Sequence, residues 1–446
     1  MKKQNISTAR CTLFAMALML SSIIVKSQHQ IPTAKELKNI SSFISKNWKG
    51  TIEFNPVDKG NLFGLPKPYN VPSVHGETMF KELYYWDTYF TNVGLLEDNE
   101  FEQAKNNVDN ILFMVKRFGK MLNGSNKVYL NRSQPPYLSM MVADIYKKSK
   151  DVKWLSEAVA LLEVEYGFWM KERMTPIGLN RYSSAATVQE KIGMANYLKE
   201  RFNDPNLLKG LSEQEIITMG SHFTAEAESG WDFNPRFLNR CEDFIPVDLN
   251  SNLYIYETNF AWFAKELKKN SDVGKWEKRA EARKKLINKY CYDKGQNMFY
   301  DYDFVNKKRS DVTSAAVFSL LFSKVATPLQ AKGIVKELPK LETNYGLRAT
   351  ESKLYGKTYQ WGETNGWAPL HFIAVKGLEN YGFVNASKRI GDKYVSTIYY
   401  NFTKTNNLWE KYNIVDGTVN TSNEYQMPAF LGWTAGVFLY LVKDKK

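Results

Sequence analysis

The chain has 446 residues, of which 43% are hydrophobic, and a formal net charge of +13. Its three cysteines are too few for a disulfide scaffold. Its four histidines lack metal-ligand spacing and no acidic cluster resembles a calcium loop, so we expect no metal or other cofactor. The lysines are spread singly along the sequence, which favours a solvated basic surface over a nucleic-acid site and leaves an anionic glycan partner as an alternative.

The N-terminus has the pattern of a secretory signal peptide. Basic residues precede the apolar run 11–25, and no acid occurs before residue 34. A run of 15 residues is shorter than the roughly 20 that a membrane-spanning helix needs. We therefore expect cleavage after residue 27 and a periplasmic or secreted protein that is not inserted in a membrane. The mature chain then keeps a net charge of +9, because residues 1–27 contain four basic and no acidic residues.

Cleavage would leave two cysteines, Cys241 and Cys291. An oxidising compartment permits one disulfide bond between them, and the sequence does not decide whether it forms.

Helical periodicity dominates the rest of the chain. Apolar residues recur at intervals of three and four over 99–118 and 247–267. The pattern predicts further helices at 33–47, 134–149, 151–173, 188–202, 211–228, 273–291, 310–339, 366–380, 384–404 and 428–443. No linker divides these helices, so we expect residues 28–446 to form a single all-α domain. A closed ring of helical hairpins accommodates that length, and the loops at one end would form a pocket.

Two carboxylates occur in aromatic surroundings: Asp232 follows Trp231 and precedes Phe233, and Glu410 follows Trp409. Cleavage of a glycosidic bond requires one carboxyl group to protonate the leaving oxygen and a second to activate water or attack the sugar. Aromatic faces stack on sugar rings. Taken singly, Asp232 would be read as a helix cap or buried structural acid and Glu410 as a surface residue.

An ordered series of motifs changes that interpretation. The segment 80–90 (FKELYYWDTYF) comes first, and Gln360-Trp361 with 365–369 (NGWAP) comes later. Between them lie 131–136 (NRSQPP), 227–233 and 245–250. This series resembles the trehalases, a glycoside hydrolase family, over nearly the whole mature chain.

The resemblance implies an (α/α)6 barrel and an inverting mechanism with Asp232 as general acid and Glu410 as general base. It also implies a small sugar substrate, either a disaccharide or an oligosaccharide, with trehalose the first substrate to test. We expect the protein to be a monomer, although the sequence does not settle the oligomeric state. The positions implied to bind the substrate are Phe80, Trp86, Asp87, Asn123, Arg132, Ser133, Gln134, Gly230, Gln360, Trp361 and Glu424.

The neighbours of the two acids fit these roles. Burial beside Trp231 and Phe233 would raise the pKa of Asp232 and keep it protonated, and Lys411 would help to keep Glu410 ionised. Trp86 and Trp361 have the alternative of being core aromatics. Arg132 and Asn123 have the alternatives of an ion-pair partner and a turn residue.

The chain also departs from the family pattern. Met79 stands where the family has arginine, and the Arg-Pro-Glu triplet expected within 183–192 is absent, with Glu190 as a candidate substitute. Gly362 and Thr364 replace the usual Asp and Pro. Because a site loses discrimination when hydrogen-bonding partners are removed, a hydrolase of a different α-glycoside and a non-catalytic glycan-binding homologue stay open as alternatives. The basic charge balance suggests a third alternative, a polysaccharide lyase, for which the sequence shows no compelling grouping of His, Tyr and Arg.

Overall fold

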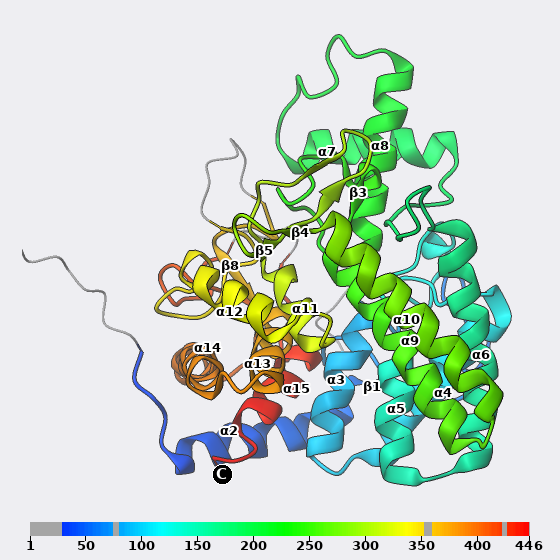
Figure 1. Ribbon diagram of the computed structural model, residues 1–446. Helices are drawn as coiled ribbons and strands as arrows, with labels where there is room; N and C mark the ends of the chain where they lie inside the picture. The colour runs from blue at the N-terminus through cyan, green and yellow to red at the C-terminus, as the bar shows by residue number, and fades with distance from the viewer. Residues whose placement is uncertain (1–28, 75–79, 352–358, 422–425, 446) are drawn as a thin grey trace, which may run out of the picture.

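The structure is a computed structural model that describes residues 29–74, 80–351, 359–421 and 426–445 (Figure 1). The predicted signal peptide, Met79 and Glu424 lie outside these residues. The α-helices are α2 (Ala34–Asn47), α3 (Tyr85–Glu97), α4 (Phe101–Phe118), α5 (Leu138–Ser149), α6 (Val152–Glu172), α7 (Val188–Arg201), α8 (Glu213–Glu228), α9 (Val247–Glu266), α10 (Asn270–Tyr290), α11 (Phe318–Phe322), α12 (Pro328–Glu337), α13 (Ala368–Asn380), α14 (Val384–Thr405) and α15 (Gly432–Val442).

The helices form two rings. Side chains of α3, α5, α9, α11, α13 and α15 line a common central cavity at one end of the molecule, so these six helices form the inner ring. In chain order they alternate with α2, α4, α6, α10, α12 and α14, which form the outer ring. This is the predicted (α/α)6 barrel. The hairpin α7–α8 is additional and stands at the rim, at the top of Figure 1.

The inner helix α3 was not predicted from the sequence. Its residues are buried on nearly every side, so the helix lacks the polar face that produces a 3.6-residue period. It packs against α15 where Gly94 meets Gly436. A Cβ atom added to Gly94 would come within 2.2 Å of the Gly436 Cα atom, so the two backbones approach closely only because both residues are glycine.

The helix predicted over 310–339 is wrong as a single element. The structure has a 3-10 turn at Ala315–Val317, then α11, then a separate α12. The break occurs at Thr327, which caps α12 in a capping box with Gln330, and Pro328 follows at the first helical position. Proline is favoured there and cannot continue a helix from the N-terminal side.

Short antiparallel strands occupy loops of the barrel. They are β1 (Ile52–Glu53), β2 (Tyr69–Asn70), β3 (Phe244–Ile245), β4 (Tyr292–Asp293), β5 (Met298–Phe299), β6 (Tyr302–Asp303), β7 (Lys308–Arg309), β8 (Asn365–Trp367) and β9 (Lys411–Asn413). Strand β8 pairs with β9, and Trp367 lies opposite Lys411. This pairing joins two motif segments that are far apart in the sequence.

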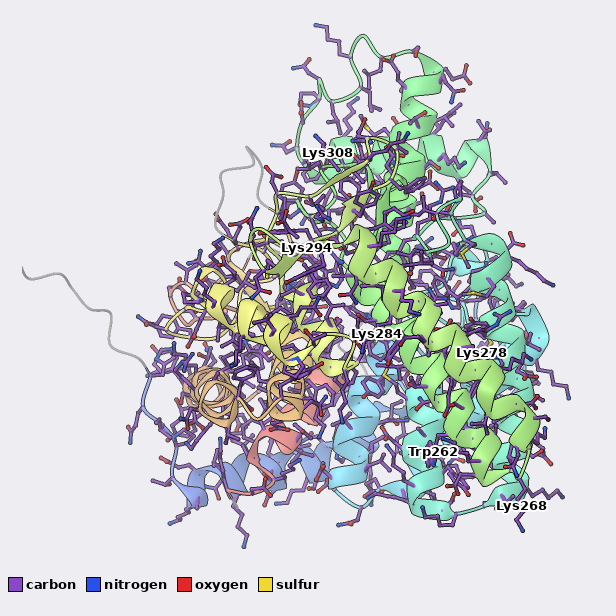
Figure 2. All side chains as sticks on the ribbon, in the orientation of Figure 1. Trp262, Lys268, Lys278, Lys284, Lys294 and Lys308 are labelled. Carbon is purple, nitrogen blue, oxygen red and sulfur yellow. The ribbon has the colours of Figure 1, made fainter. Side chains whose placement is uncertain are left out.

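The cysteines answer a question that the sequence raised. Figure 2 labels Lys278 and Lys284 on α10 and Lys294 and Lys308 in the region of β4–β7 that follows it. Cys241 and Cys291 are both buried free thiols, so they do not form a disulfide bond. Among the described residues, no helix is both long and apolar enough to cross a membrane.

Candidate active site

A cavity of about 370 Å³ lies among the predicted motif segments. The first turn of α3, the loop before α5, α7, the turn after α8, the β8–β9 region and the start of α15 all contribute to it. Its lining residues include Phe80, Trp86, Asp87, Asn123, Arg132, Gln134, Gly230, Asp232, Gln360, Trp361 and Glu410. The structure therefore brings both predicted catalytic residues and nine of the predicted binding residues into one cavity.

Asp232 is positioned by the turn that ends α8. Gly230 has φ 74°, a left-handed conformation that favours glycine. A Cβ atom there would come within 2.9 Å of the Trp86 ring, so only glycine lets this turn lie against α3. The glycine thereby fixes Asp232 beside the first turn of α3.

The base of this turn is held by a buried ion-pair network. The Arg236 guanidinium lies 2.6 Å from an Asp248 oxygen and 2.5 Å from an Asp301 oxygen. It also lies 4.9 Å from the centre of the Trp231 ring. Since charge-assisted bonds of this kind have fixed geometry, they tie the segment that carries Asp232 to the first turn of α9.

Glu410 is positioned by β9 and α15. The Trp433 indole N–H donates to the Glu410 carbonyl oxygen at 3.0 Å. The Lys411 Nζ atom lies 2.5 Å from Glu410 Oε2, and the ammonium lies 4.7 Å from the centre of the Trp367 ring. Both side chains are almost fully buried, at 0% and 5% exposure. A buried ammonium thus compensates the charge of the predicted base.

Four tryptophans form an aromatic wall next to Glu410. Trp361 and Trp367 are stacked at 3.8 Å, with Trp86 and Trp433 packed around them at 5.5 and 6.4 Å from Trp361. All four line the cavity. Flat apolar rings beside carboxylates are the pattern that sugar sites use. The Trp361 ring is also stacked with Trp231, at 5.4 Å, and is only 2% exposed, so a sugar-stacking role for Trp86 and Trp361 stays a prediction.

The amide side chains of Asn123 and Gln134 also line the cavity. The Gln134 side-chain oxygen accepts a hydrogen bond from the Trp86 backbone N–H at 3.1 Å. The Asn123 side-chain amide donates to the Ala227 carbonyl at 3.3 Å. Ser133, by contrast, is not among the lining residues, because it is fully buried and its hydroxyl donates to the Met121 carbonyl. Ser133 therefore lies behind the residues that line the cavity.

Asp87 has an unusual charge environment. Burial raises its pKa to about 7, and the charge of Glu410 acts in the same direction, whereas a hydrogen bond from its own backbone N–H lowers it. Near neutral pH the group is therefore divided between its protonated and ionised forms.

The segment without the Arg-Pro-Glu triplet forms the start of α7. Glu190 caps this helix, since its Oε2 atom accepts from the Thr187 backbone N–H at 2.7 Å. Its Oε1 atom accepts from the Asn131 amide at 3.0 Å. Glu190 is not among the cavity-lining residues, so it does not replace the missing triplet as a sugar ligand.

Two further acids on α8 support the site and were missed from the sequence. Glu228 accepts two hydrogen bonds from the Arg173 guanidinium and one each from the Ser133 and Ser183 backbone N–H groups. Burial raises the pKa of Glu226 well above its usual range, and the charge of Asp232 acts in the same direction. Glu228 falls within the 227–233 motif but was not assigned a role there, and Glu226 lies just before that motif.

Other lining residues were also missed. Met194 and Tyr197 come from α7, Tyr84 directly precedes α3, and Tyr129 ends the 3-10 turn Lys127–Tyr129 between α4 and α5. A larger cavity of about 640 Å³ at the opposite end of the inner ring contains none of the predicted site residues. Glu424 lies outside the described residues, and the described residues contain no group of three or more His, Cys, Asp or Glu side chains suited to hold a metal ion.

Comparison with known proteins identifies relatives along almost the whole chain. The family described as Trehalase matches residues 20–445. A periplasmic trehalase of Escherichia coli is 30% identical over 400 residues, which cover 86% of this chain and 69% of the relative. The neutral trehalase of Saccharomyces cerevisiae superposes with a TM-score of 0.72 at 28% identity, covering 90% of this chain and 79% of the other. A GH63 mannosylglycerate hydrolase of Thermus thermophilus, at 15% identity and a TM-score of 0.58 over 91% of this chain and 99% of its own, shares the fold.

Proposed function

The chain belongs to the trehalase family and is a glycoside hydrolase, and we propose that it cleaves trehalose or a related small α-glucoside with inversion. One observation carries this proposal. Asp232 and Glu410 line the same cavity, together with a tryptophan wall and several amide side chains. A volume of about 370 Å³ is also within the usual range of small-molecule sites.

In the proposed mechanism the Asp232 carboxyl group gives its proton to the glycosidic oxygen as the bond to the anomeric carbon breaks. Glu410 takes a proton from a water molecule that attacks the anomeric carbon from the opposite face of the sugar. Inversion requires a separation of about 6.5–9.5 Å between the two carboxyl groups, because the water must fit beside the base. The pKa of Asp232 must be high enough to keep the acid protonated, which stays a prediction.

Lys411 supports the proposed base. A general base must be ionised when the water molecule binds, and the Lys411 ammonium provides a compensating positive charge 2.5 Å from the Glu410 carboxylate. The same contact limits the motion of the carboxylate, which pre-organises it for proton transfer. We assign Lys411 to positioning and charge compensation, because its contact is with Glu410.

The cellular location is inferred from the N-terminal sequence and from the relatives. The predicted signal peptide is in line with relatives that are named periplasmic trehalases. We infer that the mature enzyme works as a monomer outside the cytoplasm, on sugar that it meets there.

Proton NMR of the purified mature protein with trehalose tests the proposal. If trehalose is hydrolysed with inversion, α- and β-glucose appear in equal initial amounts, since one half of the disaccharide leaves unchanged and the other is inverted. Release of α-glucose alone would contradict inversion. Failure to cleave trehalose or any other α-glucoside would contradict the proposed activity.

A further inference from the structure

The cavity of about 640 Å³ lies at the end of the inner ring opposite the candidate active site. The first turn of α3 carries Trp86 into the active site, whereas its last turn reaches this second cavity at Glu97. All six inner helices contribute side chains to the second cavity, and none of these residues lines the active site. The proposed hydrolysis therefore gives the second cavity no role. We call it the lower cavity.

Lysine side chains from several helices surround the lower cavity. They are Lys147 and Lys148 of α5, Lys324 after α11, Lys376 of α13 and Lys443 after α15. Glu97 and Asp144 are its lining carboxylates, so the five lysines leave the lining with a net charge of +3. The fold thus gathers positive charge from distant parts of the sequence at one opening.

Two of these lysines have an ordinary structural role. The C-terminal end of a helix carries a partial negative charge, which lysine compensates. Lys148 does this for α3, because its Nζ atom donates to the Leu96 carbonyl at 2.8 Å. The Lys147 Nζ atom lies 2.9 Å from Asp144 Oδ1. Contacts within the protein therefore account for both residues.

Lys376 and Lys443 are arranged around one aromatic ring. Their Nζ atoms lie 5.8 and 3.9 Å from the centre of the Tyr440 ring. The two ammonium groups therefore lie within about 10 Å of each other, the range over which charges still interact in 0.1 M salt. Lys376 also lies 3.8 Å from a Glu379 oxygen, which accepts a hydrogen bond from the Tyr440 hydroxyl. Because like charges repel, an anion bound beside Tyr440 would lower the free energy of this arrangement.

The buried part of the lower cavity combines aromatic and polar side chains. The Phe372 ring lies 4.8 Å from the Tyr440 ring and 6.0 Å from the Tyr89 ring. The amide side chains of Asn259 and Asn380 line the same cavity. Aromatic rings pack on the C–H faces of a sugar, and amides bind its hydroxyl groups. A hydrocarbon chain would instead cover these polar groups without giving them partners, which is unfavourable.

We propose that the lower cavity binds an anionic saccharide, a short glycan whose sugar units carry carboxylate groups. The carboxylates contact Lys324, Lys376 and Lys443, and the sugar rings contact the aromatic residues. The proposal gives a role to part of the basic charge of the chain, which cleavage of a neutral glucoside does not use. It is independent of the proposed hydrolase activity.

Isothermal titration calorimetry with trigalacturonate tests this inference. The trimethyl ester of the same trisaccharide is the control ligand, because it keeps the sugar rings and has no charge. We expect trigalacturonate to bind at least about tenfold more tightly than the ester, which corresponds to the gain from one charge-assisted contact. The affinity should fall steeply between about 50 and 500 mM salt, since salt screens exposed charges.

Equal affinity for the acid and the ester, or no binding of trigalacturonate, would overturn the inference. Tighter binding of dodecanoate than of trigalacturonate would show that the lower cavity takes amphiphiles, and would also overturn it. None of these measurements requires turnover, so their outcome does not depend on whether trehalose is cleaved.

Variants locate the binding site. Lys324→Gln combined with Lys443→Gln should weaken the binding of trigalacturonate by about tenfold or more, because two ammonium groups are lost. Lys376→Gln alone should weaken it in the same direction. Lys278→Gln combined with Lys294→Gln changes the net charge equally at exposed positions outside the lower cavity, and should keep the affinity (Figure 2). Unchanged binding in the first pair, or equal weakening in both pairs, would overturn the assignment to the lower cavity.

Discussion

The Lys411 ammonium lies 2.5 Å from Glu410 Oε2 and 4.7 Å from the centre of the Trp367 ring, and both side chains are almost fully buried. Lys411 also lies opposite Trp367 in the β8–β9 pair. Adjacent residues in an extended strand normally point to opposite faces, so this contact requires Glu410 to lie just before β9. The Lys411–Glu410 pair thus connects the proposed base to β8, which belongs to the 365–369 motif.

Replacing Lys411 by methionine should lower kcat by about 10- to 100-fold, because the base loses its charge partner and its fixed position. The free energy of unfolding should fall by about 3–5 kcal/mol, since a buried carboxylate is left uncompensated. Steady-state kinetics and urea denaturation measure the two effects. Lys404→Met, at an exposed position on α14, is the matched control. Wild-type kcat in Lys411→Met would contradict the proposed role.

Replacing Asp232 by asparagine should reduce kcat by about 10³-fold or more and leave substrate binding largely intact, because the amide keeps the shape of the side chain and has no proton to donate. Isothermal titration calorimetry with the uncleaved substrate measures binding, and glucose release measures turnover. Asn234→Asp, two residues along the same turn, is an unsuitable control because Asn234 bonds Glu226 and Trp231. Asp444→Asn, at an exposed position after α15, serves instead. Turnover close to that of the wild type would refute the acid assignment.

The ionisation of Asp87 predicts a pH dependence of stability. Its folded-state pKa of about 7 exceeds the unfolded value of about 3.9, so between these pH values the folded protein holds a proton that the unfolded chain has lost. Asp87 therefore makes the free energy of unfolding fall as pH rises from about 4 to 7. Asp87→Asn should remove this contribution, with a gain of more than about 1 kcal/mol at pH 7.5 relative to pH 5.

Urea denaturation at the two pH values measures this difference. Burial also raises the pKa of Glu165 to about 7. The free energy of unfolding of the Asp87→Asn variant should therefore still depend partly on pH. Asp444→Asn, at an exposed position, should reproduce the wild-type slope. A variant slope equal to that of the wild type would show that Asp87 does not titrate in this range.

The sequence singled out Asp232 and Glu410, whose catalytic roles stay predictions. Asp232 and Glu410 were found because glycine and aromatic residues around them form recognisable motifs, and most helices were found because their outer faces are polar. The inner helix α3 lacks that signal, since it is buried on nearly all sides. The 310–339 segment looked continuous because its apolar residues recur on both sides of the break at Thr327 and Pro328.

Met194 and Tyr197 line the cavity but could not be predicted from the sequence, for a physical reason. Met194 and Tyr197 belong to a helix whose apolar positions look like any amphipathic surface, and only the three-dimensional placement of α7 at the rim turns them toward Asp232. Ser133 shows the opposite case. Its motif marks it as a binding position, whereas the fold buries it and gives its hydroxyl to the Met121 carbonyl. Neighbouring positions in one motif can thus lie on different sides of a cavity wall.

Gly230 offers a test of how the turn positions the acid. Alanine at this position would incur about 1–2 kcal/mol of backbone strain at φ 74°. Its Cβ atom would also press on the Trp86 ring, 2.9 Å away, and displace Asp232 or the tryptophan wall. Since a shift of about 1 Å at a catalytic group can cost about 100-fold in rate, we expect kcat/KM to fall by at least tenfold.

Gly119 supplies the matched control for this substitution. It also has φ 74°, and no atom lies within 4 Å of the position that a Cβ would take. Gly119→Ala should therefore lower the free energy of unfolding by a similar amount, through backbone strain, and leave kcat/KM unchanged. Thermal denaturation measures the first effect and glucose release the second. Wild-type activity in both variants would mean that the contact between Gly230 and Trp86 does not position Asp232. An equal loss of activity in both variants would attribute the loss to backbone strain alone.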